Sequence, residues 1–309
     1  MKIIFELPFY DRTCGGVLST MDIAKHLDAH VRFQNKGTQI PEYKNISYGI
    51  NYNNISCDTF ITYSDNPYMR LLNGVVDTKI FMQSYGMAKQ ERYNATQKFA
   101  DVLCTTNKIA NAIKLDGGNA TVVGFGIDKT LLHDFKKPRG RYVAILYHDM
   151  ESKKYDTAVK VVDNLYNSRV IDGVYSFGGG VLYSKHKKPK GLIKHYHNAT
   201  REKVSEVFNK CMCYLSPSIS EGLNLTPIES TLCGCPSVLC DGDIGGVLLH
   251  NETCFIAGKE NIYEMMWGIE SIFSIFAECS EIFRENMEYL TYSNDWGTVA
   301  SKIYELCKK

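Results

Sequence analysis

Short apolar runs alternate with longer amphipathic stretches in the first part of the chain. Runs of four to six residues rich in Val, Ile, Phe and Tyr are typical of buried strands, whereas the longer stretches repeat their apolar positions with a helical period. The pattern predicts strands at residues 2–7, 58–63, 78–83, 101–105 and 120–123, and helices at 19–29, 91–99 and 108–115. This alternation of strand and helix indicates a parallel sheet covered by helices.

The alternation stops at FKKPRG, residues 135–140, and then begins again. The later pattern predicts strands at residues 142–147, 174–177, 192–195, 212–216 and 237–239, and helices at 155–165, 201–209, 262–276 and 296–307. The Pro, Gly and Lys content of the break is typical of a linker. We therefore expect an α/β protein of two Rossmann-like domains, residues 1–137 and 138–309, that face each other across a cleft.

Composition is that of an ordinary globular protein. Hydrophobic residues make up 44% and charged residues 22% of the 309 residues, and the formal net charge is +1. This balance gives no reason to expect a nucleic acid or a membrane as a partner, although residues 1–137 carry a small excess of basic residues that would tolerate an anionic one.

Eleven cysteines lie mostly in apolar segments such as CMCYL and STLCGCPSVLC. The chain opens directly on a strand-like run without a signal-peptide core, and no apolar run is long enough to span a bilayer. We therefore expect reduced, buried thiols in a cytoplasmic protein.

The segment SPSISEGLNLTPIESTLCGCPSV, residues 216–238, places two glutamates at a strand end and a helix start. Glu221 follows a strand in a Gly-containing loop. Thr226 suits a helix N-cap, Pro227 the first helical position, and Glu229 the third, which would complete a capping box. Gly234 and Pro236 then end a short helix.

A helix N-terminus suits a phosphate, because its N–H groups lack partners and it carries partial positive charge. Neighbouring carboxylates suit sugar or ribose hydroxyls, which need acceptors. Glu221 and Glu229 together therefore indicate a pocket for a phosphorylated sugar, although Glu229 is also explained by capping alone.

The same segment resembles the E-x7-E signature of the large retaining GT-B glycosyltransferase family, of the glycosyltransferase family 4-like type. Members read PS-x-x-EG-aromatic-G-x-P-x-x-EA-x-x-x-G-x-P-V. This chain differs in having Leu223 and Asn224 after the Glu-Gly pair, and Thr226-Pro227 where a single proline is usual.

The resemblance extends to YHDMESKKYD, residues 147–156. Family members usually have Gly-Arg there and a Lys five residues beyond the Arg, and both cations hold the donor diphosphate. Lys153 matches the Lys, whereas His148 replaces the Arg and offers one hydrogen bond instead of a charged fork. Lys154 is a further candidate, and a solvated Lys pair at a helix start is the plainer alternative.

Three other stretches follow the family order. The glycine pair Gly15-Gly16 resembles the loop that faces the donor phosphate, although a Gly-Gly turn is common. GFGID, residues 124–128, resembles the segment that closes the first domain. The helix 296–307, opened by Trp296, resembles the closing helix that packs back on the first domain; an ordinary terminal helix is the alternative.

Metal sites have little support in the sequence. Asp241-Gly242-Asp243 is formally a D-x-D motif, but it follows a strand where GT-B relatives carry a loop rich in Asp and Gly. His195-x-His197 and the Cys-x-Cys pairs lack zinc spacing. The basic run at 185–195 is typical of a solvated loop. We expect neither a metal nor another cofactor.

The resemblance implies transfer of a sugar, with retention, from a nucleotide-diphosphate donor to an acceptor hydroxyl. Glu221, Lys153 and His148 would act at the reaction centre. The donor would also contact Gly15, Gly16, Lys154, Gly222, Leu223, Asn224 and Glu229. The acceptor stays open among a glycan, a protein and a modified (viral) DNA base. The alternatives are an epimerase or phosphorylase on the same scaffold, and a non-catalytic protein that binds sugar nucleotides.

Overall fold

The computed structural model describes residues 1–7, 15–36, 43–49, 57–62, 77–82, 101–179, 186–219, 221–241 and 247–308. The chain forms two compact units. The first unit comprises Met1–Ile127 together with Ser293–Lys309, and the second comprises Asp128–Tyr292.

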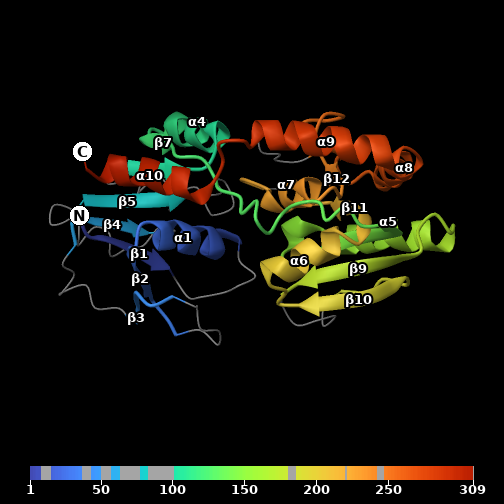
Figure 1. The fold of residues 1–309 in the computed structure, drawn as a ribbon, viewed down its shortest axis with the longest axis horizontal. Helices are drawn as coiled ribbons and strands as arrows, with labels where there is room; N and C mark the ends of the chain where they lie inside the picture. Colours follow the sequence, from blue (N-terminus) through green and yellow to red (C-terminus); the bar gives the residue numbers. More distant parts are fainter. Residues whose placement is uncertain are drawn as a thin grey trace. The chain divides into compact units, whose positions relative to one another are not determined.

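The first unit is built on a seven-stranded sheet whose strands are all parallel (Figure 1). The order across the sheet is β3-β2-β1-β4-β5-β6-β7. The strands are β1 (Ile3–Leu7), β2 (His30–Phe33), β3 (Ile46–Tyr48), β4 (Thr59–Thr62), β5 (Asp77–Met82), β6 (Asp101–Cys104) and β7 (Ala120–Val122).

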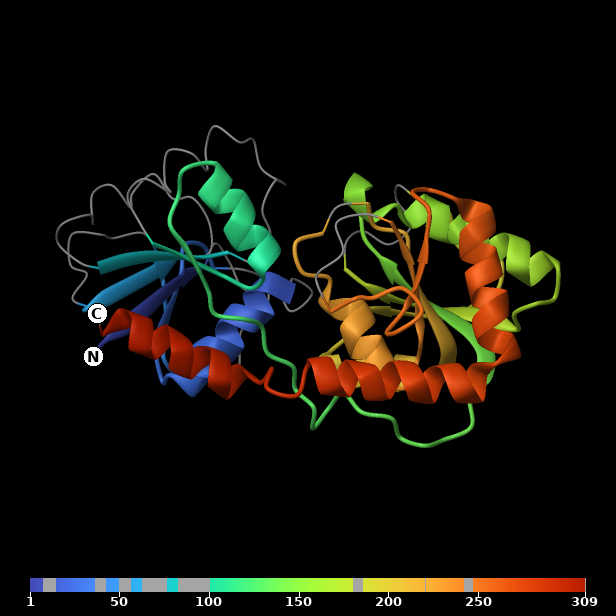
Figure 2. The same ribbon diagram turned by 90° about the horizontal axis from the view of Figure 1, so that it is seen from above.

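Helices cover both faces of this sheet because successive strand residues point to opposite sides. In β5, Phe81 packs into the core shared with helices α1 (Gly15–His26) and α10 (Trp296–Cys307). Its neighbour Ile80 packs instead with helix α4 (Asn107–Leu115). Helices α1 and α10, from the two ends of the chain, lie side by side (Figure 2).

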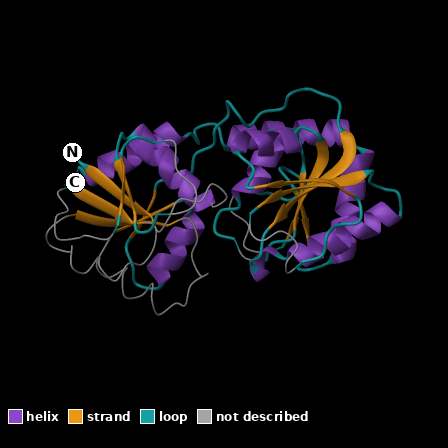
Figure 3. Cartoon of the chain, turned by 90° about the horizontal axis from the view of Figure 1, so that it is seen from below, coloured by secondary structure: helices purple, strands orange, loops and turns teal. Residues whose placement is uncertain are grey.

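The second unit contains a six-stranded parallel sheet of order β10-β9-β8-β11-β12-β13. Its strands are β8 (Gly140–Tyr147), β9 (Gly173–Gly178), β10 (Leu192–His197), β11 (Cys211–Ser216), β12 (Ser237–Cys240) and β13 (Phe255–Ala257). Its helices are the 3-10 turn η2 (Glu151–Lys153), α5 (Tyr155–Asn167), α6 (Arg201–Phe208), α7 (Leu225–Leu232), α8 (Ile262–Ser274) and α9 (Phe276–Leu290). Figure 3 shows that helices flank the sheet of each unit.

In both sheets the order in which strands are added reverses at the same point. The first unit starts at β1, adds β2 and β3 on one side, and then crosses to β4 on the other; the second unit does the same with β8, β9, β10 and β11. Such a reversal leaves a crevice beyond the carboxyl ends of the two central strands, which is where open α/β sheets bind ligands. In the second unit these ends are Tyr147 of β8 and Ser216 of β11.

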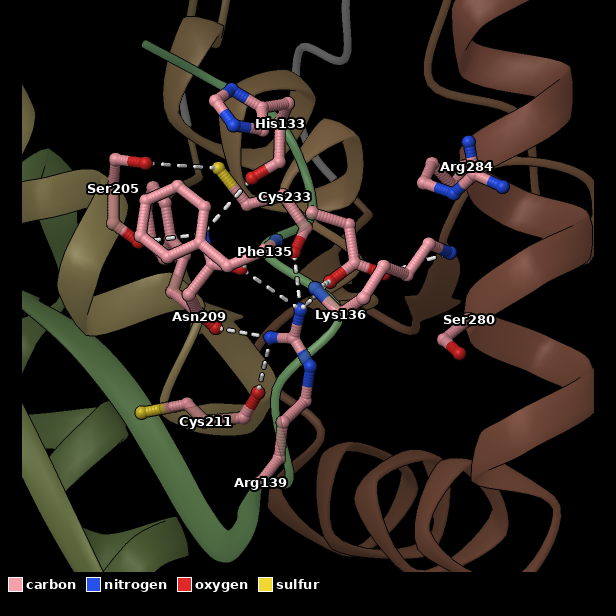
Figure 4. A network of polar contacts seen from close by, with 12 residues as sticks. His133, Phe135, Lys136, Arg139, Ser205, Asn209, Cys211, Cys233, Ser280 and Arg284 are labelled. Atoms are coloured by element: carbon pink, nitrogen blue, oxygen red, sulfur yellow. Dashed lines mark hydrogen bonds and ion pairs between the residues drawn. The ribbon is translucent and has the colours of Figure 1, made fainter.

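The segment from Asp128 to Arg139, which leads into β8, is anchored within the second unit. The guanidinium group of Arg139 donates to the carbonyl oxygens of Phe208, Cys211 and Cys233 (Figure 4). It also pairs with Asp134 at 2.9 Å, and its side chain is only 5% exposed. Because Phe208 and Cys233 end helices α6 and α7, one cation satisfies carbonyls at both helix C-termini.

These contacts explain why the compact units divide at residue 128, whereas the linker composition suggested a boundary at 137. The Ser205 hydroxyl donates to the Leu131 carbonyl, and the Asn209 side chain donates to the His133 carbonyl. Residues 128–137 therefore pack with the second unit, and Ser293–Lys309 packs with the first.

Most of the predicted elements occur in the structure. The pattern missed β2, β3 and β13, which have only three or four residues; the predicted helix 262–276 corresponds to α8, and α9 was not predicted. Helix α1 begins at Gly15, four residues before the predicted start. The predicted helix at 91–99 lies outside the described residues.

Candidate active site at the carboxyl ends of β8 and β11

The loop after β8 turns sharply before helix α5. The Met150 carbonyl accepts from the N–H of Lys153 at 3.0 Å, which closes the turn η2. Lys154 then adopts a left-handed conformation with φ 49° and ψ 43°, and α5 begins at the next residue. A left-handed non-Gly residue is strained by about 1 kcal/mol, so this geometry is imposed by its surroundings.

The loop after β11 is tied to that turn and to helix α7. The N–H of Ile219 donates to the Ser152 carbonyl at 3.0 Å, which joins the two loops. The side-chain amide of Asn224 donates to the Ser216 hydroxyl at 3.4 Å, which joins the end of β11 to the start of α7. These two bonds hold the loop that carries Glu221.

Lys153 and Glu221 form an ion pair through Nζ and Oε1. Their side chains are 18% and 12% exposed, so both charges are largely withdrawn from water. The structure therefore brings together two of the predicted catalytic residues at the crevice where ligands of such sheets bind. A charged pair in such a place provides one cation for an anionic ligand and one acceptor for hydroxyl groups.

Helix α7 begins at Leu225, with Asn224 as its N-cap. The predicted capping box is therefore wrong: Thr226 and Pro227 occupy the second and third helical positions, and Glu229 occupies the fifth. A proline fits anywhere in the first turn because the N–H groups there have no partner within the helix. Glu229 is thus not needed as a cap. The prediction that Gly234 ends the helix is confirmed.

Glu229 is half-buried. Its negative charge and that of Glu221 both affect the pKa of the buried Tyr214. Burial raises the pKa of the Tyr214 phenol, and the negative charges of Glu221 and Glu229 raise it further.

His148 is oriented by the backbone. Its Nδ1 accepts a hydrogen bond from the N–H of Met150 at 3.0 Å. A ring nitrogen that accepts carries no proton, so the proton of the neutral imidazole is on Nε2. His148 is held as a donor through Nε2 at the carboxyl end of β8.

Lys154 has a different partner from Lys153. Its Nζ lies 2.9 Å from Oε1 of Glu260, in the loop between β13 and α8. The two adjacent lysines therefore point to different acids. Lys153 reaches Glu221, and Lys154 connects the β8 loop to the opposite edge of the sheet.

The remaining predicted donor contacts come from backbone. Gly222 is buried, and Leu223 and Asn224 are half-buried in the loop before α7. Gly15 and Gly16 belong to the first unit, where they form the first turn of α1 and do not precede it. The N–H groups of a first helical turn lack intrahelical partners, which suits an anion.

In the described parts of the chain, no group of three or more His, Cys, Asp or Glu side chains is arranged to hold a metal ion. His195 instead faces Ser176, with Nδ1 3.1 Å from the hydroxyl. Asp241 is exposed, and Asp243 lies outside the described residues. The described cysteines are free thiols, and all except Cys57 are buried. No described helix combines the length and the apolar character needed to cross a membrane.

Compared by sequence, the chain matches no family model and no curated protein. Compared by structure, it is similar to HepE from Anabaena, solved in complex with UDP and glucose, with a TM-score of 0.80 and 15% identity over 100% of this chain and 99% of that one. It is also similar to sucrose-phosphate synthase from Thermosynechococcus elongatus, with a TM-score of 0.78 and 12% identity over 100% and 98% of the two chains.

A glycosyltransferase from Rickettsia africae ESF-5 gives a TM-score of 0.77 and 14% identity over 99% of this chain and 98% of that one. At such low identity the likeness establishes the fold. The predicted α/β GT-B fold with two Rossmann-like domains is therefore confirmed.

Three residues near the site were not predicted from sequence. Tyr214 and Ser216 lie two residues apart in β11 and so point to the same face of the sheet. Their position just before the Pro-Ser pair could have marked them as site residues. The strand pattern, however, is equally well explained if both side chains only pack in the core. Ser152, whose carbonyl joins the two loops, contributes only backbone and leaves no signal.

Proposed function

We propose that this protein is a glycosyltransferase that moves a sugar from a nucleotide-diphosphate sugar to an acceptor hydroxyl, with retention and without a metal. The observation that carries the proposal is the ion pair between Lys153 and Glu221 beyond the carboxyl ends of β8 and β11. When a donor binds, such a pair can separate, so that the lysine pairs with the phosphates and the glutamate accepts hydrogen bonds from the sugar hydroxyls.

We propose a role in this reaction for each group. Negative charge develops on the leaving diphosphate, so its stabilisation is expected to be the largest catalytic contribution. Lys153 supplies the positive charge, and the Nε2–H of His148 supplies a hydrogen bond. Glu221 accepts from donor-sugar hydroxyls beside the N–H groups of Gly222, Leu223 and Asn224.

Glu229 is proposed to hold the nucleotide ribose. It follows the first turn of α7, whose free N–H groups favour a phosphate. A carboxylate one turn further along the helix can accept the paired hydroxyls of a ribose while the phosphates remain at the helix start. The structural neighbours solved with UDP and glucose support a donor of this class.

The first test is binding followed by turnover. A panel of UDP-, GDP- and ADP-sugars is screened by thermal shift, and the release of nucleoside diphosphate from the best ligand is then measured with and without glycan, protein and modified-DNA acceptors. We expect stabilisation by one nucleotide class and slow release of its diphosphate. Absence of stabilisation by every nucleotide sugar would refute the proposal.

The second test is a matched pair of lysine variants. Lys153→Ala is expected to lower turnover by about 100-fold or more, in the range measured for the loss of one transition-state donor. Lys160→Ala, which removes an exposed lysine of α5, is expected to leave turnover unchanged. Near-normal turnover in Lys153→Ala would remove this lysine from the mechanism.

One observation favours a second candidate, a protein that binds sugar nucleotides without turnover. His148 offers the leaving group a single neutral hydrogen bond, since its other ring nitrogen is engaged by Met150. Tight binding of a nucleotide sugar with no release of diphosphate under any acceptor condition would select this candidate.

A further inference from the structure

The basic run of the sequence begins a positive stretch that the proposed donor site does not use. Residues 186–210, which contain β10 and α6, carry seven Lys or Arg residues and two Glu, in a chain whose formal net charge is +1. β10 is the edge strand among the described strands of the second sheet (Figure 1). The near-neutral total therefore conceals a local concentration of positive charge near this edge.

Three tyrosines from adjacent strands share one face of this sheet. Val174 of β9 points into the core shared with α5 and α8, so its neighbour Tyr175 points to the opposite face. There the Tyr175 ring meets Tyr142 of β8 edge-on, with the ring centres 5.4 Å apart. Tyr196 of β10 pairs in register with Phe177, two residues beyond Tyr175, and so lies on the same face. All three tyrosines are half-buried, which leaves part of each ring open to solvent.

Lysine ammonium groups lie over these rings. The Nζ atoms of Lys194 and Lys203 are 4.9 Å and 5.6 Å from the centre of the Tyr196 ring. The Nζ atom of Lys210, in the turn after α6, is 5.8 Å from the centre of the Tyr175 ring. Cations and aromatic rings are therefore interleaved on this surface, and at an exposed site such cation–π contacts are weak enough to be exchanged for a ligand.

Two of these three positive charges are uncompensated. Lys203 pairs with Glu206 of the same helix, and their side chains are 38% and 43% exposed. Lys194 and Lys210 are exposed and have no ion-pair partner among the described residues. An anionic ligand would thus meet free positive charge on a surface that also presents aromatic rings.

We propose that this tyrosine–lysine face binds single-stranded nucleic acid without sequence preference. The face comprises Tyr142, Tyr175, Tyr196, Lys194, Lys203 and Lys210. Aromatic rings on adjacent strands are platforms on which unpaired bases stack, and lysines act as point charges for phosphates. Stacking on a base is stronger than an exposed cation–π contact, so bases can take the ring faces while the lysines turn to the phosphates.

The residue types favour a nucleic acid over a carboxylate-bearing glycan or an acidic peptide. Carboxylates are matched best by the planar fork of arginine, whereas the cations of this face are all lysines. Neither alternative presents a flat base at every repeat for the tyrosine rings. The face is also separate from the proposed donor site, since Tyr142 precedes Tyr147, at the carboxyl end of β8, by five residues or about 16 Å. Binding here therefore does not depend on the proposed transferase activity.

Fluorescence anisotropy with a labelled oligothymidylate of about 20 nucleotides tests the proposal. The wild-type chain is expected to bind it at about 50 mM salt and more weakly at about 200 mM. A duplex of the same length should bind less tightly, because its bases are already stacked on one another. The double variant Lys194→Gln/Lys210→Gln is expected to weaken binding about tenfold and to lower the slope of log K against log salt by about 1.4, the value for two phosphate contacts to a single strand. Lys160→Gln/Lys302→Gln removes the same charge from exposed lysines of α5 and α10 and should change neither quantity.

The tyrosines supply a separate readout. Tyr196→Leu is expected to weaken binding about tenfold and to leave the salt slope unchanged, because stacking on a base releases no counterions. Tyr263→Leu, at an 84% exposed tyrosine of α8, is the matched control and should bind as the wild type does. Thermal melting of each variant verifies that it is folded.

Several results would overturn the proposal. The first is no binding of the oligothymidylate by the wild type at the lower salt concentration. Equal losses in the two lysine double variants would show an effect of net charge alone. Equal binding of single strand and duplex, or unchanged affinity in folded Tyr196→Leu, would remove the tyrosines from the site. Tight binding of heparin in place of the oligothymidylate, unaffected by Tyr196→Leu, would identify an anionic glycan as the ligand instead.

Discussion

Lys153 and Glu221 lie 68 positions apart in the chain and form an ion pair that closes the gap between the loops after β8 and β11. Neither residue is placed by its own loop alone. The turn η2 sets the position of Lys153, and the bond from the Ile219 N–H to the Ser152 carbonyl sets the distance between the loops.

The ion pair should behave as a coupled unit in stability measurements. Lys153→Met or Glu221→Gln alone is expected to lower the free energy of unfolding by about 2 kcal/mol, because each leaves a largely buried charge without its partner. The double variant is expected to regain most of this loss. A double-mutant cycle by urea unfolding measures the coupling, and additive effects would show that the pair contributes nothing to the fold.

Arg139 should be far more important to stability than its neighbour Arg141. Arg139→Ala is expected to lower the free energy of unfolding of the second unit by about 3–5 kcal/mol, because it leaves several carbonyls unpaired and removes the buried cation beside the Asp134 carboxylate, which keeps only the exposed Lys136 as an ion-pair partner. Arg141→Ala serves as the control; that guanidinium is 51% exposed beside Asp172, and little change is expected.

The two tryptophans allow this comparison to be made unit by unit. Trp267 lies in the second unit and Trp296 in the first. In a Trp296→Phe background, fluorescence during urea unfolding reports the second unit. Equal midpoints for Arg139→Ala and Arg141→Ala would contradict the role given to the buried guanidinium.

Gly234 is required by both conformation and space. It follows α7 at φ +71°, with its own N–H donating to the Thr231 carbonyl, and an added Cβ would lie 2.8 Å from Oδ2 of Asp134. Gly234→Ala is therefore expected to cost about 2 kcal/mol or more, the sum of left-handed strain and displacement of the Arg139 network.

Gly117 provides a matched control for that substitution. It has φ +82°, but nothing lies within 4 Å of an added Cβ. Gly117→Ala is expected to cost about 1 kcal/mol, from backbone strain alone. Thermal unfolding of the two variants gives the comparison, and equal losses would mean that the space around Gly234 is unimportant.

His195 should make stability depend on pH. Burial beside Tyr147 lowers its pKa to about 4 from an ordinary value of 6.5, and the nearby His197 contributes in the same direction. In the unfolded chain this histidine is protonated below about pH 6.5, whereas in the folded chain it stays neutral until the pH falls to about 4. Its stabilising effect is complete above pH 6.5 and is lost as the pH falls toward 4.

The measurement is urea unfolding at pH 7 and pH 5. The wild type should lose more stability between these values than His195→Gln, which retains a polar group for Ser176 and has no proton to take up. His133→Gln, an exposed position in the same unit, should follow the wild type. An identical loss in wild type and His195→Gln would rule out this histidine as the cause.

Local patterns were sufficient for most of the architecture. The alternation of short β-branched runs with amphipathic stretches predicted every strand longer than four residues and the helices α4, α5, α6, α8 and α10. It failed where the local signal was weak, as in β3 and β13, each of three residues, because so few positions show no clear period. The start of α7 was misplaced because Thr226-Pro227 fits two registers of a first helical turn.

The sequence by itself determined the two parallel α/β sheets and the residues that carry the candidate chemistry, since hydrophobic period and motif spacing are local properties of the chain. Only the tertiary structure decided which of these residues meet. Lys153 meets Glu221 while its neighbour Lys154 meets Glu260, and residues 128–137 join the second unit through Ser205, Asn209 and Arg139. Such partnerships depend on strand order and loop closure, which bring distant segments together without leaving a mark on the local pattern.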